Sequence, residues 1–262
     1  MLQVTQLSGF ASGGAGGVVT DGLQLHLDAG DAASYSGSGQ VWSDLTANGY
    51  DFHFGTTSSA EGSDPTFNGT AGNKSGNEYM STDGGDRFQS VSDLSSTVLR
   101  LLGREDQPFT LEVWHYYIGS TDQHIFANIA VPATGNGMEF RFSRGGSGDE
   151  VGMSYGVVPV QESTTKLTSN EWHQTAWTGQ ADGVVDCDYY INGASAAPTY
   201  QEASGFTSGE SSFGGVTLFT RTNGGFASPS GSRLAIVRVY DRILTAAEVL
   251  RNFNADKGRF GL

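Results

Sequence analysis

Several short segments of this sequence alternate strictly between apolar and polar residues, and this alternation constrains the fold more than any other feature. Residues 23–28 read Leu-Gln-Leu-His-Leu-Asp, residues 138–143 read Met-Glu-Phe-Arg-Phe-Ser, and residues 185–192 alternate in the same way. A fourth segment, residues 109–117, begins Phe-Thr-Leu-Glu-Val. Successive side chains of a β-strand point to opposite faces of a sheet, so each segment is predicted to be a strand with one buried face.

Glycine-rich and polar segments separate these strands. The chain of 262 residues contains 38 glycines, about twice the average share of roughly 7%. Loops rich in Gly, Ser, Thr and Asn are expected at 55–77, 144–149 and 203–215. The pair Asn192-Gly193 predicts a two-residue hairpin turn, because both central positions of a type I′ turn need positive φ. Many short strands joined by such turns indicate an all-β, two-sheet antiparallel jelly-roll sandwich and disfavour a helical bundle.

One short helix is predicted close to the C-terminus, starting after Leu244. Thr245 can cap the free amides of its first turn, and Glu248 can return a hydrogen bond as the second half of a capping box. Leu244 can pack against Val249, which shares a helix face with Phe253. We expect this face to pack on the sandwich.

Three segments are expected along the chain. Residues 1–20 form an arm in which an apolar stretch precedes the sequence Gly-Gly-Ala-Gly-Gly at 13–17, residues 21–256 form the jelly-roll domain, and residues 257–262 form a tail. A flexible glycine hinge after an apolar peptide suits an anchor, and the same composition suits a terminus that adds a strand to the domain. The apolar side chains that would serve as the anchor are Val4, Leu7 and Phe10.

The N-terminal segment does not resemble a secretory signal, because it has neither a basic region nor a continuous apolar core. The sequence also contains no run of 18 apolar residues that could span a bilayer. We therefore expect neither membrane insertion nor ordinary secretion.

The charge of the chain is strongly negative. Fourteen Lys and Arg residues stand against 28 Asp and Glu residues, which gives a formal net charge of -14. Nucleic-acid binding needs a basic footprint, so we expect none. Residues 233–262 differ, with six basic and three acidic side chains. This basic end suits docking onto an acidic protein surface, and it equally suits a solvated helix face with a tail.

The order of four motifs resembles the laminin-G-like jelly roll of the concanavalin A-like lectin and glucanase superfamily. The motifs, in chain order, are residues 22–28 with 42–45, 108–114, 172–173 with 188–193, and 237–249. The resemblance covers roughly residues 20–256 and implies the sandwich described above. Three large side chains that could fill the gap between two sheets, or stack on sugars, are Trp114, Trp172 and Trp177.

Two further stretches resemble the versions of this domain that occur in structural proteins of tailed bacteriophages. They are residues 27–35 and residues 252–262, and the apolar, glycine-rich arm is similar to that group as well. The resemblance implies a virion protein on the particle surface, made in the host cytoplasm without a signal peptide. It further implies a capsid decoration or a head-fibre or tail-associated protein that contacts major capsid or tail proteins as a homo-oligomer.

The acidic residues are the first candidates for a catalytic site. A glycosidase needs two carboxylates roughly 5–9 Å apart, and the family-16 glucanase pattern Glu-x-Asp-x-x-Glu is absent. Asp186 and Asp188 alternate on one strand face, and we interpret them chiefly as a solvated face, with calcium binding or catalysis as alternatives. The single cysteine, Cys187, and the five histidines form no recognisable catalytic or metal motif. We therefore expect no enzyme activity.

Calcium is the one cofactor that the acidic residues in the loops could bind. It needs six to eight oxygen ligands, and the pairs Asp83 with Asp86 and Asp28 with Asp31 each offer only two side chains. Acidic turn residues that bond to their own backbone are the simpler interpretation. We expect no cofactor.

A soluble glycan-binding module is the second functional hypothesis, and a glycan-cleaving enzyme is the third. Host-surface glycans would then be the partners, bound through a sheet face and loop aromatics. The aromatic residues available for such contacts are Tyr200, Phe206, Phe213 and Phe219. Aromatic side chains also fill protein cores, so these four residues alone decide nothing.

Overall fold

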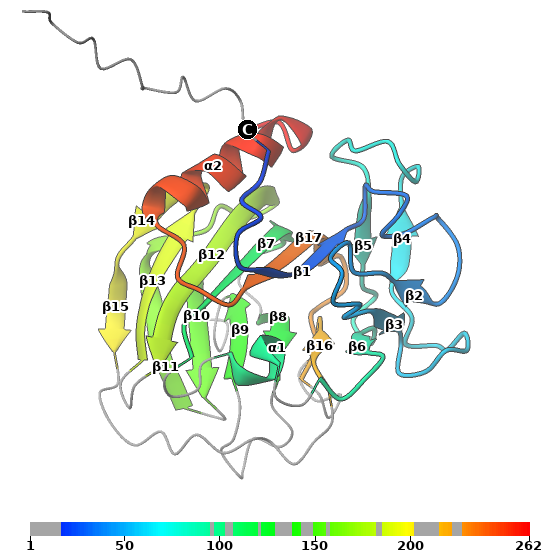
Figure 1. The fold of residues 1–262 in the computed structure, drawn as a ribbon, viewed down its shortest axis with the longest axis horizontal. Helices are drawn as coiled ribbons and strands as arrows, with labels where there is room; N and C mark the ends of the chain where they lie inside the picture. Colours follow the sequence, from blue (N-terminus) through cyan, green and yellow to red (C-terminus); the bar gives the residue numbers. More distant parts are fainter. Residues whose placement is uncertain are drawn as a thin grey trace, which may run out of the picture.

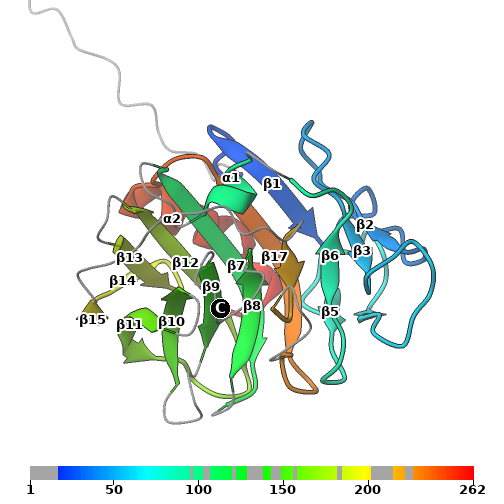
Figure 2. The ribbon, with the colours of Figure 1, turned by 90° about the horizontal axis from the view of Figure 1, so that it is seen from below.

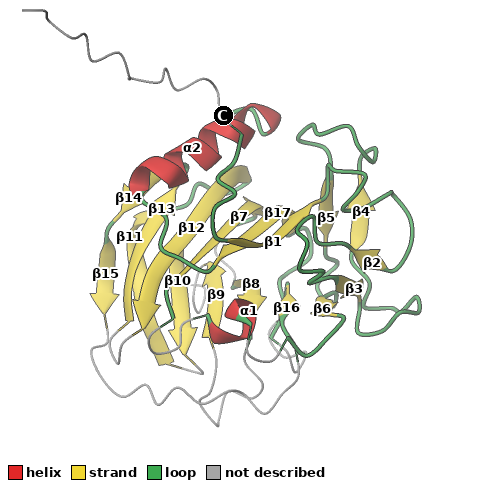
Figure 3. Ribbon diagram, viewed as in Figure 1, coloured by secondary structure: helices red, strands yellow, loops and turns green. Residues whose placement is uncertain are grey.

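The computed structural model describes residues 17–94, 97–102, 107–119, 122–128, 138–142, 149–155, 158–181, 185–201, 215–221 and 227–262. Within these residues the chain forms two antiparallel sheets packed face to face, with the longer helix on the outside of one of them (Figure 1; Figure 3). The all-β sandwich is therefore confirmed. The predicted anchor residues Val4, Leu7 and Phe10 lie outside the described residues.

The first sheet has eight strands. Its strands, in spatial order, are β14 (Ala194–Ala196), β13 (Val185–Ile191), β12 (Glu171–Ala181), β7 (Phe109–Tyr117), β17 (Arg233–Tyr240), β5 (Tyr79–Ser81) and β4 (Thr66–Asn68), with β1 (Leu23–Asp28) also paired to β17. Three of the four predicted strands belong to this sheet as β1, β7 and β13. Strand β17 pairs with β7 on one side and with β1 and β5 on the other. The last described strand in chain order therefore lies near the middle of the eight-stranded sheet.

The second sheet has nine strands. In spatial order they are β15 (Pro198–Gln201), β11 (Val158–Lys166), β10 (Glu150–Tyr155), β9 (Met138–Phe142), β8 (Gln123–Ala127), β16 (Thr217–Leu218), β6 (Phe88–Ser90), β3 (Phe52–Phe54) and β2 (Val41–Trp42). This sheet lies beneath the first, as Figure 2 shows from below. The fourth predicted strand is β9, whose Phe140 and Phe142 enter the core while Glu139 and Arg141 lie on the opposite face.

Aromatic side chains fill the space between the sheets. Trp177 packs edge-on against Phe140 at 5.3 Å between ring centroids and lies flat on Phe142 at 5.8 Å. Of the three predicted core tryptophans, Trp177 alone lies between the sheets. Trp114 is fully buried on the outer face of the eight-stranded sheet, and Trp172 is half-buried there, because both occupy strand positions that point away from the core.

Helix α2 (Ala246–Asp256) lies across the outer face of the eight-stranded sheet, and the short helix η2 (Lys257–Arg259) continues it (Figure 1). Its apolar face covers a cluster that includes Val19, Tyr240 and Val249. Beyond it, Phe260 stacks on Trp114 at 4.3 Å between centroids. The segment 257–262 therefore packs on the sandwich through Phe260. The single-turn helix α1 (Val98–Leu101) was not predicted.

The predicted local signals for this helix and for the hairpin are present. Thr245 and Glu248 form a complete capping box at the start of α2. Asn192 and Gly193 have φ angles of 53° and 74° between β13 and β14, as a type I′ turn requires. None of the helices in the described ranges is long and apolar enough to pass through a lipid bilayer.

Candidate functional site

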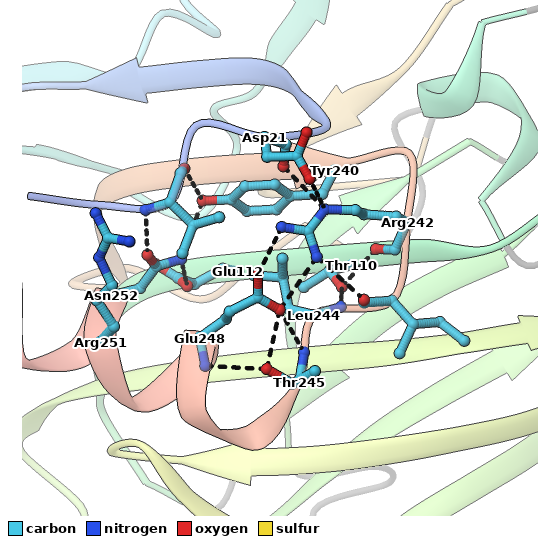
Figure 4. A network of polar contacts seen from close by, with 12 residues as sticks. Asp21, Thr110, Glu112, Tyr240, Arg242, Leu244, Thr245, Glu248, Arg251 and Asn252 are labelled. Atoms are coloured by element: carbon cyan, nitrogen blue, oxygen red, sulfur yellow. Dashed lines mark hydrogen bonds and ion pairs between the residues drawn. The ribbon is translucent and has the colours of Figure 1, made fainter. Parts of the chain in front are cut away.

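The first described residues are fixed against α2, and this junction is the point where the predicted arm meets the body of the domain (Figure 4). The backbone N–H of Val19 donates to Oδ1 of Asn252 at 2.7 Å, and its carbonyl accepts from the Tyr240 hydroxyl at 3.0 Å. Arg251 donates from Nε to the carbonyl of Gly17 at 2.8 Å. Residues 17–19 are therefore held at a defined place beside α2.

Asn252 holds this junction together from the buried face of α2. Its Nδ2 donates to Glu112 at 2.9 Å and to the Tyr240 hydroxyl at 3.0 Å, while its Oδ1 accepts from Val19 (Figure 4). The side chain is completely buried. The sequence carries a signal for this buried role of Asn252. Asn252 lies three residues after Val249, which places a polar side chain on the apolar face of the predicted helix.

Arg242 forms a second link between the chain start and the helix. Its guanidinium contacts Asp21 through Nε at 3.0 Å and Glu248 through Nη2 at 2.7 Å (Figure 4). The hydrogen bonds from Arg242 are the largest cause that lowers the pKa of Glu248 to about 2. Glu248 is therefore ionised at neutral pH and serves both the capping box and this ion pair.

A buried charge network lies beneath the same helix. Arg238 donates from Nη1 to Glu112 at 2.7 Å and pairs through Nη2 with Asp256 at 2.7 Å. Its Nε also donates to Nε2 of His26 at 3.2 Å. Burial, and then the Arg238 charge, lower the pKa of His26 to about 3, so His26 is neutral and acts as an acceptor.

The basic residues near the C-terminus are mostly occupied within the domain. Arg238, Arg242 and Arg259 each pair with carboxylates, Arg259 reaching both oxygens of Asp28 at 3.0 and 2.9 Å. Lys257 lies over a phenyl ring. The excess positive charge of residues 233–262 therefore does not form one unpaired basic patch.

The four aspartates considered for calcium are used in other ways. The carboxylate of Asp28 is held by Arg259, and Asp31 pairs with Lys74 at 2.7 Å. Asp86 accepts from the backbone N–H of Asp83 at 2.8 Å, and the Asp83 carboxylate accepts from the backbone N–H of Gly85 at 3.1 Å, as acidic turn residues do. The described part of the chain contains no group of three or more His, Cys, Asp or Glu side chains arranged to hold a metal.

The remaining candidate residues do not form a site together. Asp188 is exposed on β13, and the side chain of Asp186 lies outside the described atoms. Phe219 is fully buried in the core and is unavailable to a ligand. Phe206 and Phe213 lie outside the described residues, as does the side chain of Tyr200.

A buried polar cluster occupies the outer face of the nine-stranded sheet. No sequence pattern indicated this cluster. The carboxylate of Glu139 is bound by the guanidinium of Arg221 through both Nε and Nη2, the latter at 2.9 Å. Arg141 lies 3.9 Å from the same carboxylate, and His124 lies 3.7 Å from it. Burial, and then the charges of Arg141 and Arg221, lower the pKa of His124 to about 3.

Two antiparallel sheets with a C-terminal helix on one outer face define the class of lectin-like β-sandwich domains. The family model described as the concanavalin A-like lectin/glucanases superfamily matches residues 83–250. The chain therefore belongs to that superfamily. No curated protein matches the sequence.

Several solved structures share the fold. The sialidase of Trypanosoma rangeli in complex with sialic acid superposes with a TM-score of 0.60 at 15% identity, over 92% of this chain and 34% of the sialidase. Domain 4 of the GH43 arabinanase AbnA of Geobacillus stearothermophilus, in complex with arabinotriose, gives 0.54 at 16% identity, over 87% and 96%. The binding domain of Paraclostridial Mosquitocidal Protein 1 gives 0.57 at 12% identity, over 89% and 52%.

These similarities show the fold alone, because the identities are low. The chain spans about a third of the length of the sialidase that it matches. It corresponds to nearly the whole of the arabinanase domain, so the sandwich occurs in that protein as a unit of its own.

Proposed function

We propose that this chain is a non-catalytic attachment protein of a bacteriophage particle, in which the arm holds the sandwich to the capsid or tail. The observation that carries the proposal is the position of the junction. Gly17 and Val19 are bound beside α2 on the outer face of the eight-stranded sheet, and the nine-stranded sheet lies on the other side (Figure 1). An anchor starting there leaves the opposite face free for display.

The sequence resemblance to phage structural proteins supports the location, and the apolar composition of the arm supports the mode of attachment. Partners would be major capsid or tail proteins. A particle carries many copies of such a protein, so weak individual contacts suffice through avidity. The junction would make the attachment directional, because Gly17 and Val19, which follow the apolar stretch of the arm, are bonded to α2 on one side of the sandwich.

The absence of enzyme activity is also part of the proposal. The buried carboxylates of Glu112 and Glu139 are each bound by an arginine, which keeps them from acting as paired catalytic acid and base. Asp188 is exposed on a strand face. These placements support a binding protein rather than a hydrolase.

Glycan binding by the same sandwich is the second candidate function. It is favoured by the similarity to the arabinanase domain solved with arabinotriose, which matches this chain over most of both lengths. A glycan-binding body and an anchoring arm are compatible, since they use different parts of the chain.

Substitution of the arm tests the attachment. The variant with Val4, Leu7 and Phe10 all changed to Ser is expected to fold normally and to be lost from purified particles. The matched control changes Thr5, Gln6 and Ser8 to Ala and is expected to be retained. Immunoblots of particles, with thermal unfolding of both purified variants, provide the readout. Retention of the apolar-to-Ser variant at wild-type level would refute the arm as the anchor.

A further inference from the structure

Four half-buried side chains lie together on the outer face of the eight-stranded sheet, beyond the end of α2, where Phe260 contacts one of them, Trp172, at 4.8 Å between ring centroids. Tyr116 of β7 is the direct cross-strand neighbour of Trp172 in β12 and of Arg233 in β17. Tyr79 of β5 completes the group, with its ring centroid 5.7 Å from that of Trp172. We call these four residues, Tyr79, Tyr116, Trp172 and Arg233, the aromatic platform.

Arg233 is fixed in the middle of this platform. Its guanidinium carbon lies 4.7 Å from the ring centroid of Tyr79 and 4.2 Å from that of Tyr116. Trp172 in turn contacts the Tyr116 ring edge-on at 5.7 Å. Cation–π contacts are made to the ring faces and do not use the N–H groups of a guanidinium as hydrogen-bond donors.

Those N–H groups have no acceptor in the part of the chain that the structure describes. Arg233 forms neither an ion pair nor a hydrogen bond there, whereas Arg238 and Arg259 each bind a carboxylate. A guanidinium held in place without an anionic partner is complementary to a carboxylate, which it can bind through two parallel hydrogen bonds.

The aromatic surroundings select the kind of carboxylate. Aromatic rings present a negative face, on which the weakly positive C–H groups of a sugar ring can stack. Ser81 is the cross-strand neighbour of Arg233 on the side away from Tyr116, and Asn68 donates to its hydroxyl at 2.9 Å. Rings, one cation and a polar border are the usual composition of a small-ligand site.

We propose that the aromatic platform binds a carboxylate-bearing sugar, with the sugar ring on Trp172 and Tyr116 and the carboxylate on Arg233. The net charge of -14 opposes long anionic polymers. The platform is therefore expected to recognise one or two acidic sugar units through direct contacts, rather than a long charged chain. The proposal goes beyond attachment to a particle, and its test uses the purified chain without particles.

The test measures binding of three probes to the full chain by titration calorimetry. The probes are trigalacturonate, trimannuronate and sialyllactose, each compared with its methyl ester, which keeps the ring and removes the charge. At least one free acid is expected to bind, and its ester at least about tenfold more weakly, as expected when a charge-assisted contact is lost. Binding of none of the acids, or equal binding of acid and ester, would overturn the proposal.

Two variants locate the site. Arg233→Gln is expected to weaken binding of the acid at least about tenfold and to leave binding of the ester unchanged. Lys166→Gln removes the same charge from an exposed position on β11, in the opposite sheet, and is expected to change affinity less than about twofold. Equal effects of the two substitutions would contradict the platform.

An acidic protein segment is the competing ligand. Hexaglutamate carries carboxylates without sugar rings and is expected to bind no more tightly than the methyl esters. Hexaglutamate binding that equals that of the acidic sugars and is lost in Arg233→Gln would overturn the sugar assignment in favour of a protein partner.

Discussion

At the scale of single residues, Asn252 connects three segments of the chain that are far apart in the sequence. Its side chain bonds to the segment before β1 through Val19, to β7 through Glu112 and to β17 through Tyr240. Each of these partners is buried, so a lost bond leaves a polar group without water. The residue therefore links the arm junction to the stability of the whole domain.

Replacing Asn252 with Ala is expected to destabilise the domain by about 3 kcal/mol, because several buried hydrogen bonds are lost together. Urea unfolding followed by tryptophan fluorescence gives the measurement. Asn254→Ala, at an exposed position of the same helix, is expected to change stability by less than about 0.5 kcal/mol. Similar losses for both variants would show that the contacts of Asn252 are not responsible.

Asp86 makes stability depend on pH. Burial raises the pKa of this carboxyl to about 6, from 3.8 for the free side chain. The folded state therefore binds the proton more tightly than the unfolded state. Its contribution to stability is fully present below pH 3.8 and is lost as the pH rises through 6.

The variant Asp86→Asn imitates the protonated side chain and is expected to be more stable than the wild type at pH 7.5, by about 1–3 kcal/mol. The difference should fall toward zero near pH 4. Chemical unfolding at a series of pH values checks this, with Asp188→Asn as the exposed control. A gain that stays constant from pH 4 to pH 7.5 would contradict the proposed titration.

At the scale of elements, strong periodicity predicted four of the strands, and local motifs predicted helix α2. The strand predicted at residues 23–28 appears as β1 with the same bounds, and the capping box of α2 is complete. The short strands β2 to β6 were not predicted, because two or three residues are too few to show a period. Helix α2 and the Asn192-Gly193 turn meet in space, and no sequence pattern indicates that contact.

Gly193 is the point where the hairpin touches α2. A Cβ atom there would lie 3.0 Å from both Leu250 Cδ1 and Phe253 Cδ1, and the φ angle is +74°. Gly193→Ala is expected to destabilise the domain by about 2 kcal/mol, through backbone strain and crowding of the helix together.

Gly39→Ala is the matched control for this change. Gly39 also has a positive φ, of +105°, but no atom lies within 4 Å of its virtual Cβ. Thermal unfolding should therefore show the smaller loss for Gly39→Ala, since only backbone strain acts there. An equal loss for both variants would mean that the hairpin does not constrain α2.

At the scale of the whole molecule, the polar networks could not be predicted, because their members are far apart in the sequence. Arg238 and Glu112 are separated by 126 positions, and Arg221 and Glu139 by 82. In the strands of Arg238, Glu112 and Glu139 the charged residue stands between apolar neighbours, which indicates an outward position but not a partner. Several arginines of the basic C-terminal segment likewise pair with carboxylates that are distant in the sequence, and the segment alone does not show this.

The two sides of the sandwich differ in a way that suits directional attachment. The side with α2 holds the start of the described chain, and β10 and β11 belong to the opposite sheet. The single cysteine, Cys187, is buried, so introduced cysteines can be labelled without background from it. This allows each side to be probed on an assembled particle.

Maleimide labelling of two single variants, Ala247→Cys on α2 and Thr165→Cys on β11, tests the account most directly. Both positions are exposed in the isolated domain, so both purified variants should react equally. On intact particles, the account predicts that Ala247→Cys is protected and Thr165→Cys remains reactive. Protection of Thr165→Cys with free labelling of Ala247→Cys, or equal labelling of both, would contradict attachment through the side that carries α2.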